Sequence, residues 1–501
     1  MSLATVLTRA QWGVEAPLVH VEVHLGSGLP AFQLVGLAET AVRESRERVR
    51  AALQMSGFDF PAGRLTVNLA PADVPKEGGR FDLPLALGVL AASGQLPPES
   101  LTATEFYGEL SLEGELRPTH SLLVAAARAA QAGHRVVVPS NCLSQVSCVP
   151  GVVAAGAAHL RAVVDHLAGR EPLAFREGSP PAARGAPPPD LAEVQGQTLA
   201  RWALEVAAAG GHSLLLVGPP GAGKSLLADR LIGLLPPLTD EEALESAIIA
   251  AAAGCSSHPY GQRPFRAPHH TATAVALVGG GQPPRPGEVT LAHRGVLFLD
   301  ELTEFGRAVL EVLREPLENR RITVARGRWQ VLFPADCQLV AAMNPCPCGY
   351  HGDDRRCRCG PGEVRRYLGR ISGPFLDRID LQVFLPQETT LAAANPAPEG
   401  SATVRERVVA ARARQHARGW LNAQLPLAQL PATAPMTPAA AALLEEGLRR
   451  RKLSMRAQHR TLRVARTLAD LAGSDLLEAT HLSQALGLRQ LEAMLTASLP
   501  P

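Results

Sequence analysis

One run of eight residues restricts what this chain can fold into more than any other feature. Residues 218 to 225 read Gly-Pro-Pro-Gly-Ala-Gly-Lys-Ser, which fits the pattern G-x-x-x-x-G-K-S, and they directly follow an apolar run from Ser213 to Val217. A buried strand that enters a helix through a glycine-rich loop presents backbone N–H groups and a helix N-terminus to phosphate. The order therefore predicts an α/β fold that binds a nucleoside triphosphate.

A second apolar run supplies the groups that hydrolysis needs. Val296 to Leu299 leads directly into Asp300 and Glu301. We expect Lys224 to reach the β- and γ-phosphates, Ser225 and Asp300 to hold Mg²⁺, and Glu301 to take a proton from the attacking water. ATP and Mg²⁺ are thus the expected cofactors, and the nucleotide would lie on Gly218, Pro219, Pro220, Gly221, Ala222, Gly223, Lys224 and Ser225.

Length and charge set wider limits. The 501 residues allow two to four domains, and the net charge of +2 means that any nucleic-acid contact must come from local basic patches. The longest charge-free stretch, Val136 to Leu160, contains two prolines and is a poor membrane span. The N-terminus lacks the pattern of a secretory signal, so we expect a soluble, cytoplasmic protein.

The chain divides into five segments by composition. Residues 1–168 alternate strand-like and helical runs, and 169–190 form a proline-rich linker. Residues 191–386 carry the nucleotide motifs in an αβα core, 387–435 form a further linker or extension, and 436–501 form an all-helical lid. In the first segment we expect strands at Leu18–Leu25, Leu65–Leu69 and Arg135–Val138, and helices at Glu39–Met55, Leu83–Ala92 and Leu122–Ala132.

Three polar residues beyond the phosphate loop complete the expected hydrolytic set. Asn344 ends the apolar run that starts at Leu339, and it would orient the attacking water. Arg378, which we expect to be exposed between two acidic residues, would stabilise charge on the γ-phosphate of a neighbouring subunit. Arg456, at the start of a predicted helix, would contact the γ-phosphate of its own chain.

This order of motifs resembles an AAA+ ATPase, with Walker A, Walker B, sensor 1, arginine finger and sensor 2 in sequence. A closer resemblance is to the magnesium-chelatase-like ComM/YifB family. It rests on the run Arg-Pro-Phe-Arg-Ala-Pro-His-His-Thr at 263–271, Leu-Val-Gly-Gly-Gly at 277–281, Pro-Gly-Glu at 286–288, the run 291–302 around Asp300, and Asn-Pro-Cys-Pro-Cys-Gly at 344–349.

The resemblance implies a hexameric ring, an insert in the second helix of the ATPase core, and a DNA helicase that promotes branch migration during recombination and natural transformation. Recombination proteins are implied as possible partners. One departure concerns the residues after the two histidines. The family has a Thr-hydrophobic-Ser-Asp run there, whereas this chain has Thr271-Ala272-Thr273-Ala274, so part of a DNA contact is in doubt.

Basic loops are the predicted DNA interface. The segment 262–294 combines six basic residues with a single acid and three consecutive glycines, and a hairpin-like stretch follows at 321–333. Arginine binds phosphate, and a glycine-rich backbone permits close approach. Two other roles stay open, subunit packing for the segment and metal binding for the paired histidines. The candidate DNA residues are Arg263, Arg266, His269, His270, Arg285, Arg326 and Arg328. The arginine-rich stretch 404–418 is a further candidate, with a solvated helix face as its alternative.

Four cysteines form a predicted structural zinc site. Cys346-x-Cys348 and Cys357-x-Cys359 are eight residues apart and supply the four thiolates of a tetrahedral ion, with free loop thiols as the alternative. Four protein ligands leave no open position, so this zinc would hold the loop 344–360 in place rather than take part in catalysis.

The N-terminal segment resembles the Lon-protease-like fold. The run Pro-Lys-Glu-Gly-Gly at 75–79 is similar to the Pro-Lys-Asp-Gly-Pro run before the nucleophilic serine of active Lon proteases. Arg80 stands at the serine position, and no lysine occurs between 76 and 224. Lacking nucleophile and activator, this domain is predicted to be non-catalytic.

These observations favour an ATP-hydrolysing hexameric DNA translocase. The alternative is a chelatase-type ATPase that energises metal insertion through partner subunits. A nucleotide-switched scaffold is a third class, which the Asp300-Glu301 pair disfavours.

Overall fold

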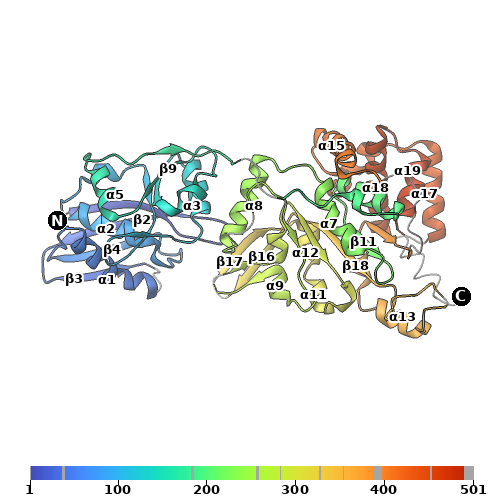
Figure 1. The fold of residues 1–501 in the computed structure, drawn as a ribbon, viewed down its shortest axis with the longest axis horizontal. Helices are drawn as coiled ribbons and strands as arrows, with labels where there is room; N and C mark the ends of the chain where they lie inside the picture. Colours follow the sequence, from blue (N-terminus) through green and yellow to red (C-terminus); the bar gives the residue numbers. More distant parts are fainter. Residues whose placement is uncertain are drawn as a thin grey trace. The chain divides into compact units, whose positions relative to one another are not determined.

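The computed structural model describes residues 2–36, 40–181, 186–255, 259–282, 284–326, 329–353, 355–387, 398–451 and 454–489. The chain is mixed α/β and separates into two units (Figure 1). The first contains residues 1–184 and 239–261, and the second contains 185–238 and 262–501. Among the described residues no helix combines the length and apolar character needed to cross a membrane.

The first unit is built on an eight-stranded mixed sheet, in the order β10-β9-β8-β5-β1-β2-β4-β3. Every residue of helix α2 is buried, because the helix packs on β1 and β2 and is covered by α1. The strands are β1 (Ser2–Arg9), β2 (Leu18–Gly26), β3 (Ala31–Val35), β4 (Arg64–Ala70), β5 (Thr104–Phe106), β8 (Arg135–Pro139), β9 (Val153–Ala157) and β10 (Arg176–Glu177). The helices are α1 (Thr40–Met55), α2 (Asp82–Ala92), α3 (Leu122–Gln131), α4 (Leu143–Val146) and α5 (Leu160–Leu167).

Two segments lie differently from the sequence-based division. Residues 176 and 177, inside the predicted linker, form β10 and pair with β9. Helix α8 (Asp240–Ala252), inside the predicted αβα core, belongs to the first unit. Its apolar residues Leu244, Ala247 and Ile248 pack against the cluster around α3, which explains the association.

The second unit is built on a five-stranded parallel sheet. Its order is β12-β15-β18-β11-β19, with strands β12 (Phe265–Arg266), β15 (Val296–Leu299), β18 (Gln338–Met343), β11 (Leu214–Val217) and β19 (Leu381–Phe384). β11, β15 and β18 are buried throughout, as expected for parallel strands covered on both faces. The carboxyl ends of all five strands meet at one edge.

Helices and hairpins surround this sheet. The helices of the core are α6 (Thr198–Gly210), α7 (Lys224–Leu234), α9 (Ala274–Val278), α10 (Glu288–Leu291), α11 (Arg307–Glu311), α12 (Arg314–Asn319), α13 (Pro361–Leu368) and α14 (Gly373–Leu376). Two hairpins join them, β13 (Gly279–Gly280) with β14 (Arg285–Pro286) and β16 (Arg321–Arg326) with β17 (Trp329–Pro334).

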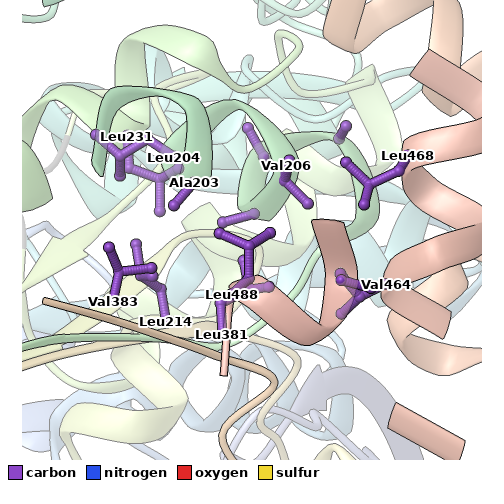
Figure 2. Packing of buried hydrophobic residues seen from close by; sticks show 14 of the residues in the cluster. Ala203, Leu204, Val206, Leu214, Leu231, Leu381, Val383, Val464, Leu468 and Leu488 are labelled. Carbon is purple, nitrogen blue, oxygen red and sulfur yellow. The ribbon is translucent and has the colours of Figure 1, made fainter. Parts of the chain in front are cut away.

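The C-terminal helices share one hydrophobic core with the sheet. They are α15 (Ser401–Ala417), α16 (Leu430–Thr433), α17 (Pro438–Arg451), α18 (Met455–Ala472) and α19 (Ala479–Gly487). Figure 2 shows Val464 and Leu468 of α18 in one cluster with Val206 of α6, Leu381 of β19 and Leu488. Gln382 also donates its N–H to the carbonyl of Leu488, at 2.7 Å. The lid is therefore fixed to the sheet through α6 and β19.

Candidate nucleotide site and its surroundings

The phosphate loop connects β11 to α7 as the motif requires. Gly221 and Gly223 have φ angles of 77° and 86°, which only glycine adopts without strain. Gly218 is required for a different reason. A Cβ added there would lie only 2.7 Å from the carbonyl oxygen of Leu385. The glycines at these positions are thus explained by the backbone path.

Lys224 lies at the start of α7 and folds back over the loop. Its Nζ donates to the carbonyls of Gly218 (2.7 Å) and Pro219 (2.9 Å) and to Oδ1 of Asn344 (3.1 Å). Burial lowers the pKa of Lys224, and the nearby Asp300 and Glu301 only partly oppose this shift. The two residues predicted to act on the γ-phosphate, Lys224 and Asn344, are therefore neighbours.

Ser225 and Asp300 meet at the same edge of the sheet. Ser225 Oγ donates to Asp300 Oδ2 at 2.7 Å, although the two residues are 75 positions apart in the chain. A hydroxyl and a carboxylate oxygen in contact are ligand types that Mg²⁺ prefers. This pair is the candidate metal site of the nucleotide.

Glu301 has an unusual backbone and a histidine partner. Its φ of 51° lies in the left-handed region, and its N–H donates to Asp300 Oδ1 at 2.9 Å. His270 Nδ1 lies 2.9 Å from Glu301 Oε2. In the sequence, His270 belongs to a predicted DNA-binding loop and Glu301 to a predicted hydrolytic site, and no pattern indicates that they pair.

The four cysteines gather beside the phosphate loop. All four Sγ atoms lie within 4.8 Å of one another, and Cys346 is 3.3 Å from Cys348 and 3.9 Å from Cys357. Zinc–sulfur bonds of about 2.3 Å in a tetrahedron separate the sulfurs by roughly 3.8 Å, so the quartet can hold a metal ion. Backbone N–H groups of Arg358 and Tyr350 lower the pKa of Cys348 to about 6, which favours a thiolate ligand.

The cysteine loop also contacts the phosphate loop directly. Gly349 has a φ of 87°, and a Cβ added there would lie 2.5 Å from Cδ of Pro220. Only glycine permits this approach, so the position of the cysteine loop and that of the phosphate loop depend on each other.

Arg378 and Arg456 lie at the other end of the strands. Both guanidiniums contact Oε1 of Glu318 at 2.9 Å. They line a cavity of about 380 Å³ together with Ser213, Gln338 and Asp380, which precede or begin strands β11, β18 and β19. Because the phosphate loop follows the opposite end of β11, Arg456 does not approach the phosphate loop of its own chain, and the expectation of a contact within one chain is wrong for this structure.

The expectation that Arg378 is exposed is also wrong. Arg378 is 6% exposed, and its Nη1 donates to the carbonyl of Pro374 at 2.6 Å. Three further arginines line the cavity, so that five arginines face two carboxylates there: Arg320, Arg378, Arg456, Arg460 and Arg463 against Glu318 and Asp380. Burial favours protonation of Asp380, but Arg460 and His212 outweigh it and hold the pKa of that carboxyl well below its usual range.

The predicted DNA residues fall into three groups. Arg263 donates to the carbonyls of Pro236 and Arg294, and Arg266 forms a bidentate pair with Glu288 (2.7 and 2.8 Å), so both guanidiniums have structural partners. His269 and Arg285 are exposed, whereas His270 is half-buried against Glu301. The side chain of Arg326 and the whole of Arg328 lie outside the described residues.

Two arginines of α15, Arg407 and Arg412, serve packing within the second unit. Arg407 pairs with Glu205 at 2.6 Å and with Glu399 at 2.8 Å, and Arg412 donates to the carbonyl of Ala208. These contacts join α15 to α6, so Arg407 and Arg412 have structural partners that neither the DNA role nor the solvated-face alternative predicted.

In the first unit, Lys76 and Arg80 are buried and donate to backbone carbonyls, Lys76 to Pro71 and Arg80 to His120. Burial lowers the pKa of both groups.

Comparison with known proteins identifies the class of the chain. A family model described as magnesium chelatase, subunit ChlI, matches residues 190–394, and two related models match 21–142 (subunit ChlI of Mg-chelatase) and 398–489 (subunit ChlI, C-terminal). This family is of the AAA+ ATPase type, which supports an ATPase.

Full-length relatives narrow the class further. The chain is 47% identical to the uncharacterised protein YifB of Escherichia coli over 99% of its own length and 98% of that protein. It is 46% identical to the competence protein ComM of Haemophilus influenzae, over 99% of both chains. The chain therefore belongs to the magnesium-chelatase-like ComM/YifB family, which confirms the resemblance found in the sequence.

Proposed function

We propose that this protein is an ATP-hydrolysing DNA translocase. In this proposal it acts as a hexameric ring, in keeping with the family resemblance, and promotes branch migration in recombination and natural transformation. The observation that carries the nucleotide chemistry is the meeting of Lys224, Ser225, Asp300 and Asn344 at one sheet edge. In this proposal Lys224 and the loop N–H groups bind the phosphates, Ser225 and Asp300 hold Mg²⁺, and Glu301 is the base.

The cavity around Glu318 supports a site shared between subunits. Five arginines and two carboxylates make it cationic, and guanidinium groups bind phosphate oxygens strongly. Because Arg378 and Arg456 lie away from their own phosphate loop, each would act on the nucleotide of the neighbouring subunit. A ring provides that arrangement at every site.

Two observations support DNA as the substrate. The relative from Haemophilus influenzae is named a competence protein. In this chain, exposed His269 and Arg285 lie in the segment between β12 and β15 and are available to phosphate. The chelatase alternative has its own support in the ChlI family models.

Dissociation of a labelled mobile four-way DNA junction tests the proposal. We expect the wild-type protein with ATP and Mg²⁺ to separate the junction, and the Glu301→Gln variant to leave it intact. The DNA proposal would be contradicted if ATPase activity is intact but unaffected by DNA and no junction is separated. This result would favour the chelatase type, and the next measurement would then be stimulation of ATP hydrolysis by partner subunits.

The proposal includes one structural zinc ion per chain, held by Cys346, Cys348, Cys357 and Cys359. Because Gly349 packs on Pro220, loss of this ion should disturb the phosphate loop. We expect metal analysis to find about one zinc per chain in protein purified without chelator. The double variant Cys348→Ser/Cys357→Ser should lose the zinc and bind ATP more weakly.

Cys148→Ser is the matched control, since Cys148 lies in the first unit, outside the quartet. It should keep both the zinc and the ATP affinity. Wild-type protein without zinc would show that the four cysteines are free thiols.

A further inference from the structure

Three segments of the second unit meet at one oxygen atom of Glu318. Nη2 of Arg378 and Nη2 of Arg456 both lie 2.9 Å from its Oε1. Glu318 lies near the end of α12, Arg378 lies between α14 and β19, and Arg456 lies in the first turn of α18. Guanidinium groups bind phosphate oxygens as they bind carboxylate oxygens. Oε1 therefore takes the position that an oxygen of a bound phosphate would take between the two arginines.

The other arginines of this cavity already have partners. Arg460 forms an ion pair with Asp380. Arg320 forms an ion pair with Asp336, and Arg463 donates to a backbone carbonyl. Among the described residues, the two guanidinium groups at Oε1 therefore share a single carboxylate, and one positive charge is left for a second anion.

Arg378 also has an unused hydrogen-bond donor. Its side chain is buried, and its Nε has no hydrogen-bond partner among the described residues. A buried N–H group that lacks an acceptor destabilises the folded chain, so a ligand that supplied the acceptor would gain binding free energy. The side chains of Glu318 and Arg456 are 37% and 47% exposed, which lets an anion reach this part of the cavity from solvent.

We propose that Glu318 is a positioning residue that holds Arg378 and Arg456 in place of a phosphate. It yields both arginines to the γ-phosphate of a neighbouring subunit's ATP and takes them back after hydrolysis, which promotes release of the phosphate. The identity of that phosphate rests on the proposed function, in which both arginines act on the nucleotide of the neighbour.

Two physical differences decide which anion the arginines bind. A γ-phosphate carries more negative charge than a carboxylate and is fixed by the phosphate loop of its own subunit, so it displaces Glu318. Free inorganic phosphate loses translational freedom when it binds, whereas Glu318 is attached to α12 and competes at a high local concentration. Once the bond to ADP is broken, Glu318 therefore displaces the phosphate.

Titration with inorganic phosphate tests whether Glu318 competes for the arginines. The titration uses full-length Lys224→Ala protein without nucleotide, because this background weakens the phosphate loop as a second phosphate site. Addition of Glu318→Gln removes the competing charge. We expect the dissociation constant for phosphate to fall about tenfold, as for loss of one competing hydrogen bond between charged groups. Further addition of Arg378→Ala should reverse this gain, which locates the phosphate in the cavity.

ATP turnover of protein with an intact Lys224 gives the second readout. Glu318→Gln and Glu318→Ala should both be inhibited by inorganic phosphate at about tenfold lower concentration than the wild type. Glu315→Gln is the matched control and should keep the wild-type value, since Glu315 is exposed three residues earlier on α12 and does not line the cavity. A merely structural role of Glu318 would spare the glutamine variant, whose amide oxygen still accepts N–H groups, and would leave phosphate inhibition unchanged.

The inference would be overturned if the dissociation constant for phosphate stays at the parent value in both Glu318→Gln and Glu318→Ala, and this result would not affect the proposal of a shared site. A lower constant that persists after Arg378→Ala would also overturn it, because the phosphate would then bind elsewhere. Tighter phosphate binding in the cavity without stronger inhibition of turnover would keep Glu318 as the competitor and reject the site shared between subunits. Failure of the inference and failure of the proposed function are thereby distinguished.

Discussion

Glu301→Gln is expected to bind ATP as tightly as the wild type while hydrolysing it roughly 10²–10⁴-fold more slowly, the range that a general base contributes. The glutamine side chain has nearly the same size, and the backbone contact of residue 301 is made by its own N–H to Asp300. The left-handed turn should therefore persist, and the phosphate loop should be unaffected. Phosphate release measures turnover, and binding of a fluorescent ATP analogue measures affinity.

Two control variants accompany this measurement, one expected to lose ATP binding and one expected to keep wild-type turnover. Lys224→Ala should lose ATP binding, because its Nζ contacts the carbonyls of the loop that would surround the phosphates. Glu304→Gln changes a carboxylate three residues further along, which pairs with Arg370 at 3.0 Å on the surface. It should turn over at the wild-type rate. Turnover of Glu301→Gln within tenfold of wild type would mean that another group is the base.

Sequence patterns predicted the local elements of the nucleotide site well. The strands at 214–217, 296–299 and 338–343 agree with the apolar runs, and the glycine spacing defined the loop. These predictions succeed because a buried parallel strand and a phosphate loop each leave their pattern in residues that are adjacent in the sequence. The helix start at Ser454 follows the same logic, since its hydroxyl accepts the N–H of Ala457.

Contacts between distant residues could not be read in this way. Nothing in the spacing of His270 and Glu301, or of Glu318 with Arg378 and Arg456, indicates that these side chains meet. The expected exposure of Arg378 was wrong because nothing in the neighbouring sequence indicates that this side chain is buried and pairs with Glu318 of α12. Likewise, α8 follows the phosphate-loop helix in sequence but packs by its apolar face in the first unit.

Arg378→Ala is expected to slow ATP hydrolysis on the order of 10³-fold while ATP binding and ring assembly persist, because arginine fingers contribute about that much to phosphoryl transfer. The position of Arg378 requires that it act on the nucleotide of a neighbouring subunit. Arg378 precedes β19, the phosphate loop follows β11, and the two strands run parallel with Leu214 opposite Leu381. The four residues of β11 alone separate the two ends by more than about 13 Å.

The folded chain should tolerate this substitution. Glu318 keeps Arg456 as a partner at 2.9 Å, so removal of Arg378 leaves no unpaired carboxylate. Arg365→Ala, on the exposed face of α13, is the matched control and should retain full turnover. Full activity of Arg378→Ala in an assembled ring would exclude it as the finger and direct attention to Arg456, the more exposed of the pair.

Mixed rings decide whether the arginine acts between subunits. Arg378→Ala chains retain Glu301, and Glu301→Gln chains retain Arg378, so each variant alone should be nearly inactive. In a mixed ring, a Glu301→Gln neighbour can supply Arg378 to a site that contains an intact Glu301. Turnover should therefore reappear on mixing and reach a maximum near equal amounts. If the mixtures stay as inactive as the separate variants, both residues act in the site of one chain. The proposal of a site shared between subunits would then be wrong.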